Sequence, residues 1–184
     1  MKKSKIFIGL FAWLLVFSAC KNTSSSESSA DVVPNIDDEV KACFEQVNLF
    51  RTGDEAFYWN SDDTTKTDLT GQLGTLTLDE TLCKAAQIRS NEIVNNFAHT
   101  RPDGTSCFTV LKDVSVSYSG CGENIAAGNK TGVATFNQWK EDSCSYSGQG
   151  HRRNMLGNYT KIGIAYTYDA ESTYKYYWTM ILTR

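Results

Sequence analysis

The residues best suited to chemistry lie in three short polar segments that are far apart in the sequence. They are His99 in the first, Glu123 in the second, and Glu141, Asp142 and His151 in the third. Imidazole and carboxylate groups bind zinc and similar divalent cations. The same groups serve as general acids and bases. If the three segments meet in the fold, these side chains can form a metal site or an acid–base site.

Spacing alone does not bring these side chains together. The chain has only two histidines, 52 positions apart, and neither belongs to an H-E-x-x-H helix that would force two ligands onto one face. From residue types and spacing alone, scattered loop residues that satisfy buried backbone groups are the favoured interpretation.

Helices and strands must position these segments. Apolar residues recur every three or four positions in three stretches, and alternate in two stretches near the C-terminus. We predict helices over 37–51, from 79 to about 95, over 106–111 and over 131–141, and strands over 114–118, 162–168 and 174–182. Helices come first and strands follow, so the chain is predicted to be α+β rather than a regular βαβ series.

The N-terminus has the pattern of an export signal. Three lysines precede the apolar run 6–17, which is too short to span a bilayer as a helix. The residues before Cys20 resemble a bacterial lipobox, so we expect a lipoprotein signal peptide over 1–19 and lipidation of Cys20. An ordinary secretory signal is the alternative. Residues 20–36 are expected to form a Ser-rich flexible tether.

A single domain is expected over 37–184. Within it, residues 54–75 are polar and rich in Thr and Asp, and are interpreted as an inserted loop. If Cys20 carries lipid, five cysteines remain as disulfide candidates in an exported domain. They are Cys43, Cys83, Cys107, Cys121 and Cys144. Five thiols form at most two bridges, and the sequence does not assign the pairing.

Charge excludes one class of partner. Without the first 19 residues the chain has 15 basic and 21 acidic residues. Binding to nucleic acid requires clustered Lys and Arg that neutralise phosphates, so no nucleic acid is expected as a partner.

Several motifs, in order along the chain, resemble the CAP superfamily. This is the family of cysteine-rich secretory proteins, antigen 5 and pathogenesis-related 1 proteins, whose domain is also called SCP. The motifs are His99-x-Arg101-Pro102-Asp103-Gly104, Gly122-Glu123-Asn124-Ile125-Ala126, Trp139, Gly150-His151-Arg152-x-Asn154-Met155-Leu156 and Ile162-Gly163-Ile164-Ala165. The resemblance runs from about Asp37 to Arg184, and indicates a bacterial exported lipoprotein member of the family.

The resemblance implies an α-β-α sandwich with a central antiparallel sheet and a large cleft. It also implies that two histidines and two acidic residues meet in the cleft and hold a divalent cation, often zinc. These positions are His99, Glu123 and His151, with Asp142 or its neighbour Glu141 as the second acid. Glu123 is expected to accept a hydrogen bond from a histidine, and Asn154 to support the loop backbone. Residues 143–149 depart from the family pattern.

Three functions follow from this resemblance. The first is a lipid-anchored binding module whose cleft takes a metal and a lipid-like, sterol-like or peptide ligand, in host or envelope interaction. The second is a hydrolase or protease, either metal-dependent or using a Cys144–His151 pair. The third is a structural envelope protein. His99, Glu123 and His151 are the catalytic candidates, although no serine stands in a recognisable nucleophile elbow.

Overall fold

The structure is a computed structural model that describes residues 37–184. The expected signal peptide over 1–19, the lipidation of Cys20 and the tether over 20–36 fall outside these residues. Within the described part, no helix is long and apolar enough to cross a membrane.

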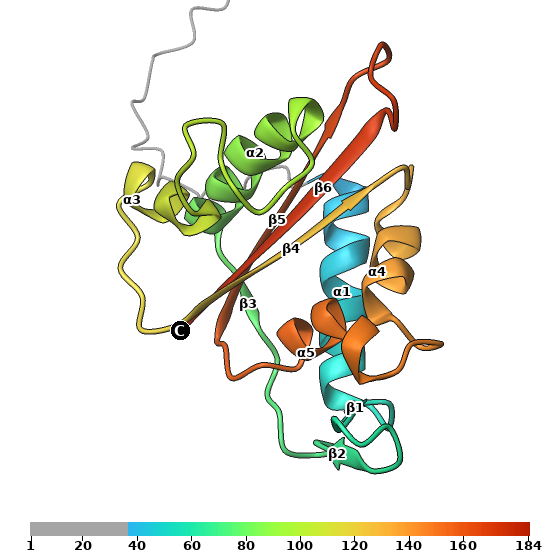
Figure 1. Cartoon of the computed structure of the whole chain (residues 1–184). Helices are drawn as coiled ribbons and strands as arrows, with labels where there is room; N and C mark the ends of the chain where they lie inside the picture. Colours follow the sequence, from blue (N-terminus) through green and yellow to red (C-terminus); the bar gives the residue numbers. More distant parts are fainter. Residues whose placement is uncertain (1–36) are drawn as a thin grey trace, which may run out of the picture. The chain divides into compact units, whose positions relative to one another are not determined.

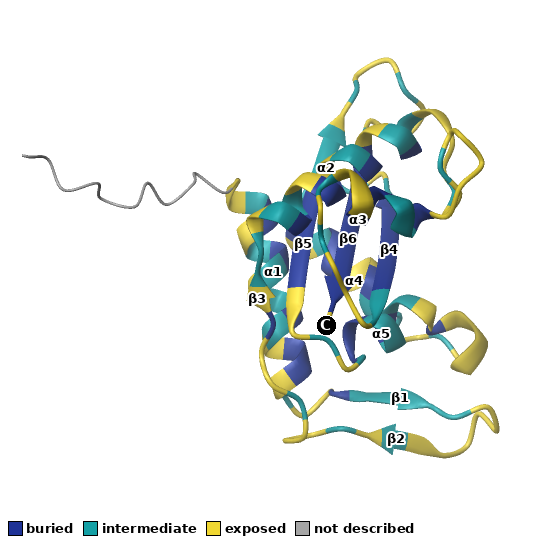
Figure 2. Ribbon diagram, turned by 90° about the vertical axis from the view of Figure 1, so that its left-hand side faces the viewer, coloured by how far each residue is buried: buried dark blue, intermediate teal, exposed yellow. Residues whose placement is uncertain are grey.

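A four-stranded sheet forms the middle layer, in the order β3-β5-β6-β4 (Figure 1). Strands β4 (Cys121–Ala127), β5 (Lys161–Tyr168) and β6 (Tyr176–Thr183) pair antiparallel. The two-residue β3 (Thr77–Leu78) pairs parallel with the start of β5. Burial is concentrated in the central strands (Figure 2).

Helices cover both faces of this sheet. One face carries α2 (Glu80–Asn95), the short 3-10 helix η1 (Cys107–Thr109) and α3 (Val110–Asp113). The other face carries α1 (Asp38–Thr52), α4 (Gly132–Lys140) and α5 (Gly150–Met155), preceded by the 3-10 helix η2 (Tyr146–Gly148). This is the α-β-α sandwich that the resemblance implied.

Because strand side chains alternate in direction, a hydrophobic core forms on each face of the sheet. Successive strand side chains point to opposite faces, so Ala165 and Ile181 pack under α2, while Ile164 and Met180 pack under α1 and α4. Helix α2 lies especially close to the sheet at Gly163. A Cβ there would stand 2.1 Å from the carbonyl carbon of Leu82, so only glycine allows this approach.

The predicted helices are present with ends shifted by one or two residues, and both C-terminal strands are present. The strand predicted over 114–118 is wrong. Ser115 has a φ of 58° and donates its backbone N–H to the carbonyl of Lys112, so the chain turns here, and the strand begins at Cys121. The segment 54–75 contains a small hairpin, β1 (Phe57–Trp59) paired with β2 (Lys66–Asp68).

The five cysteines of the described residues are all free, so the expected disulfides are not seen. Cys43 is buried on the α1 side of the sheet, Cys83, Cys107 and Cys121 lie on the α2 side, and Cys144 is in the loop before η2.

Candidate functional site

A cleft of about 570 Å³ brings the three polar segments together. Its lining residues are polar or glycine: His99, Glu123, Glu141, Ser147, Gly148, Gly150, His151, Arg153 and Asn154. The two histidines, 52 positions apart in sequence, therefore face one hollow together with two carboxylates. Asp142, the other candidate for the second acid, does not line it.

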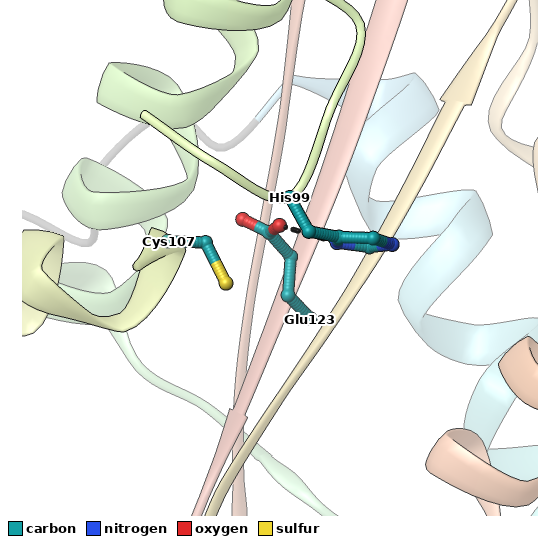
Figure 3. Close-up of side chains that lie close together, drawn as sticks. All are labelled: His99, Cys107 and Glu123. Carbon is teal, nitrogen blue, oxygen red and sulfur yellow. Dashed lines mark hydrogen bonds and ion pairs between the residues drawn. The ribbon is translucent and has the colours of Figure 1, made fainter. Parts of the chain in front are cut away.

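The first wall is a histidine held by a buried carboxylate. Oε1 of Glu123 lies 2.7 Å from Nδ1 of His99, and the two side chains point toward one another from β4 and the loop after α2 (Figure 3). Glu123 is buried, whereas the His99 side chain is 56% exposed. A carboxylate can only accept, so Nδ1 is the donor of this hydrogen bond, and in the tautomer protonated only at Nδ1 the Nε2 atom keeps its lone pair.

Arg89 holds this carboxylate from the other side. Its Nε donates to Oε2 of Glu123 at 2.7 Å, and its guanidinium also pairs with Glu92. Burial alone would raise the pKa of Glu123, but the hydrogen bonds from His99 and Arg89 and the charge of Arg89 outweigh it and lower that pKa. Glu123 is therefore an anion fixed in place inside the fold.

The second wall is also a histidine held by a carboxylate, here His151 and Glu141. Oε1 of Glu141 lies 2.6 Å from Nδ1 of His151, and its Oε2 accepts the backbone N–H of His151 at 3.1 Å. Glu141 ends α4 in the left-handed region, with a φ of 51°, which turns its side chain back toward α5. Non-glycine residues rarely adopt this conformation, and those that do cluster at functional sites.

Asp142 instead faces away from the histidines. Its carboxylate accepts from Arg152 at 2.8 Å and from Lys140 at 3.0 Å. Of the two acids that the sequence left open, Glu141 is thus the one on His151. Asp103 is also outside the cleft, because it accepts from the backbone and hydroxyl of Thr105.

The cleft lies along the outer edge of β4, which among the described residues pairs only with β6. Outward-facing carbonyls of an edge strand need partners. Asn154 donates to the Glu123 carbonyl at 3.1 Å, and the Trp139 indole donates to the Ile125 carbonyl at 3.1 Å. Asn154 thereby joins α5 to the strand that carries Glu123, and fixes the distance between the walls.

The segment 54–75 supports the second wall. The Gln149 side chain accepts from the backbone of Trp59 at 2.8 Å and donates to the carbonyl of Glu141 at 3.3 Å. Asp63 accepts from the backbone of Tyr146 at 2.7 Å. The hairpin β1–β2 is therefore bonded to the segment 143–149.

Cys144 lies in a separate hollow of about 340 Å³ with Trp59, Asp63 and Asp142. His151 does not line that hollow, and its Nδ1 is bonded to Glu141. The structure therefore does not form the Cys144–His151 pair considered for a cysteine hydrolase.

Two residues of the site were missed by sequence reasoning. Arg89 falls on the apolar stripe of α2 between Ala86 and Ile93, and an arginine on such a stripe is the signal that would have indicated a buried ion pair. Cys107 was considered only for disulfides. Its Sγ belongs to a group with His99 and Glu123 whose ligand atoms lie within 4.8 Å of one another.

The donor types that line the cleft suit a divalent cation. Both histidines have Nδ1 fixed by a carboxylate, an arrangement that orients metal-binding histidines and leaves Nε2 as the ligand atom. Zinc accepts two imidazoles together with water or carboxylate in a tetrahedral shell. His99 and His151 would hold the ion, and Glu123 and Glu141 would orient them.

The fold and the cleft define a class: a three-layer α-β-α domain with two histidine–carboxylate pairs facing one hollow. A family model described as the cysteine-rich secretory protein family, CAP, matches residues 44–182. The chain belongs to this family.

Individual relatives agree with that assignment. The chain is 38% identical over 94 residues to the protein YkwD of Bacillus subtilis. The matched region covers 50% of this chain and 34% of YkwD. An extracellular protein of Bacillus anthracis containing a SCP domain matches with a TM-score of 0.58 at 23% identity, over 80% of this chain and 40% of the other. An outer surface protein of Borrelia burgdorferi matches with a TM-score of 0.57 at 16% identity, over 80% of this chain and 92% of the other. The chain thus spans well under half the length of the two Bacillus proteins.

Proposed function

We propose that this domain is an exported binding module, anchored at the bacterial cell envelope through a lipid on Cys20, whose cleft binds a divalent cation and a peptide ligand. The observation that carries the proposal is the pair of histidine–carboxylate couples that line one hollow. Two relatives with the same fold are described as extracellular and outer-surface proteins, which supports export.

The lining of the cleft favours a peptide over a lipid. Every residue that faces it is charged, polar or glycine. A lipid tail would find no apolar wall there, whereas the end groups and polar side chains of a peptide would find hydrogen-bond donors and a cation.

The metal is tested first with the protein purified without a histidine tag. Because the chain has only two histidines, zinc titration followed by NMR of the imidazole nitrogens reports each one separately. We expect both Nε2 resonances to shift at one equivalent of zinc. Unchanged resonances, or equal zinc content in the His99→Ala/His151→Ala double variant, would overturn the metal proposal.

The choice between the two neighbouring acids gives a matched pair of variants. Glu141→Ala removes the carboxylate that orients His151 and should weaken zinc binding about tenfold to a hundredfold. Asp142→Ala removes a carboxylate that pairs with Arg152 and Lys140 and should leave zinc affinity unchanged. Isothermal titration calorimetry measures both, and equal losses would contradict the assigned roles.

The ligand is tested with a random peptide library and with palmitate. Zinc-dependent peptide binding that is lost in His151→Ala supports the proposal. Binding of palmitate but of no peptide overturns the proposed peptide ligand. Peptide cleavage that is lost in His151→Ala would replace the binding module with the metal-dependent hydrolase.

The anchor is tested by mass spectrometry of envelope extracts, which should show the mass of a lipid on Cys20. Cell fractionation provides a second test, because Cys20→Ser should release the protein from the membrane fraction.

A further inference from the structure

His99 and Glu123 also belong to a second group of metal-binding atoms. A ring nitrogen of His99, Sγ of Cys107 and a carboxylate oxygen of Glu123 lie within 4.8 Å of one another. Figure 3 shows the three side chains close together, with Glu123 between Cys107 and the ring of His99. His151 and Glu141 take no part in this group.

The backbone fixes the two loop ligands relative to one another. The N–H of Cys107 donates to the carbonyl of His99 at 3.0 Å, and Thr100 and Ser106 form a bridge just inside that contact. Residues 99–107 are thus a closed turn whose two ends present an imidazole and a thiol. Glu123 completes the group from a rigid strand, so folding alone assembles it.

Distances allow an ion at the centre of the group. Zinc binds nitrogen and oxygen at about 2.0–2.1 Å and sulfur at about 2.3 Å, so its tetrahedral ligand atoms stand roughly 3.5 Å apart. The atoms here lie between 2.7 Å, for His99 and Glu123, and 4.8 Å. Shifts of about an ångström in side chains would suffice, and His99 is exposed enough to move.

Charge also favours a cation at this place. Arg89 and Arg101 are linked by ion pairs to Glu92, Glu123 and Asp113, so two positive charges face three negative ones. Burial and the charge of Glu123 raise the pKa of the Cys107 thiol to about 12, so the thiolate, a fourth negative charge, forms only when a cation takes the place of its proton. A divalent ion would then neutralise the cluster, which otherwise contains Glu123 as a buried anion.

We propose that His99, Cys107 and Glu123 form a thiolate-containing zinc site, distinct from the pair of histidines in the cleft. Zinc displaces the thiol proton of Cys107 and forms a bond to the sulfur, with His99 Nδ1 and Glu123 as the other protein ligands. The site goes beyond the cleft metal, because it uses the opposite nitrogen of His99 and does not need His151. An ion here leaves the His99 Nε2 protonated, so the two positions exclude one another.

Cobalt substitution of the whole protein, reduced and without a histidine tag, tests this site. Cobalt bound by a thiolate gives a sulfur-to-metal charge-transfer band in the near ultraviolet, which imidazole and carboxylate ligands do not give. We expect this band in the wild-type protein, a more intense band in His151→Ala because the cleft then no longer competes for His99, and complete loss of the band in Cys107→Ser. Cys83→Ser is the matched control, because Cys83 is also a free thiol on the α2 side but lies outside the group.

The outcomes separate this site from the cleft metal. A band that is absent, that persists in Cys107→Ser or that vanishes in His151→Ala overturns the thiolate site, even where the cleft binds zinc. Conversely, a band in His151→Ala with no shift of the His151 resonance in the wild type would support this site and overturn the cleft metal. Near-ultraviolet circular dichroism confirms that Cys107→Ser is folded. A Cys107–Cys121 disulfide in native material would also overturn the proposal, because it removes the thiol.

Discussion

Glu123 connects the chemistry of the cleft to the stability of the fold. It is buried on β4, accepts from His99 and Arg89, and is one of two carboxylates on that arginine. A buried arginine that loses its counter-charge is costly. The same residue therefore has to be ionised both for orienting His99 and for compensating Arg89.

Replacement of Glu123 should have a pH-dependent effect on stability. The pKa of Glu123 is below its ordinary value of 4.5 in the folded protein, so its charge stabilises the fold above that pH. This contribution is lost as pH falls through the lowered pKa. We expect Glu123→Gln to lower the free energy of unfolding by about 3 kcal/mol at neutral pH, and by much less in acid.

Urea denaturation at roughly pH 7 and pH 3 measures this difference. Glu45→Gln, at an exposed position of α1, is the control and should have little effect at either pH. A destabilisation of Glu123→Gln that stays constant across this range would show that the ion pair with Arg89 does not carry the effect.

At the scale of elements, periodic segments were predictable and aperiodic ones were not. Helices α1, α2 and α4 have apolar stripes that the sequence displays directly. The short α5 has no such stripe, and depends on burial of Arg152 and Met155 by distant segments. For the site, family motifs indicated His99, Glu123 and His151, but only tertiary packing distinguishes Glu141 from Asp142, because one left-handed residue decides which carboxylate turns inward.

The contact between α2 and β5 gives an element-scale prediction. A methyl group on Gly163 would overlap the backbone of Leu82 and Cys83, which cannot move independently of the helix. We expect Gly163→Ala to lower the free energy of unfolding by about 3 kcal/mol through overpacking. Gly74→Ala is the control, because its added methyl would meet no atom within 4 Å. Thermal denaturation of both variants measures the effect, and similar melting temperatures would contradict this close approach.

At the scale of the whole molecule, the cleft joins two separately supported walls. His99 and Glu123 are held from the α2 side of the sheet through Arg89, whereas His151 and Glu141 are held from the α5 side. The second wall also depends on the hairpin β1–β2, which precedes it in sequence by about 90 residues. Changes in that hairpin should therefore alter the environment of the His151 imidazole and leave that of His99 unchanged.

Gln149→Leu tests this dependence with little change in volume. It removes the acceptor for Trp59 and the donor to Glu141, at a cost of about 1–3 kcal/mol for the buried polar groups left unpaired. Hydrogen exchange of residues 57–68 should become faster, and the imidazole resonance of His151 should shift while that of His99 stays. Gln72→Leu, which loses only a bond to the nearby Asp68 carbonyl, is the control. Equal exchange rates in the two variants would show that the hairpin is held by other contacts.

The side chains that cover the edge of β4 restrict how a ligand can be recognised. Many proteins bind extended peptides by β-strand addition, in which the main chain of the guest pairs with an open strand edge. Here Asn154 and Trp139 already occupy the carbonyls of Glu123 and Ile125. A ligand in this cleft therefore cannot form main-chain hydrogen bonds with β4 at these positions. Its selection must therefore depend on end groups and side chains, so affinity should depend more on a free carboxylate than on peptide length.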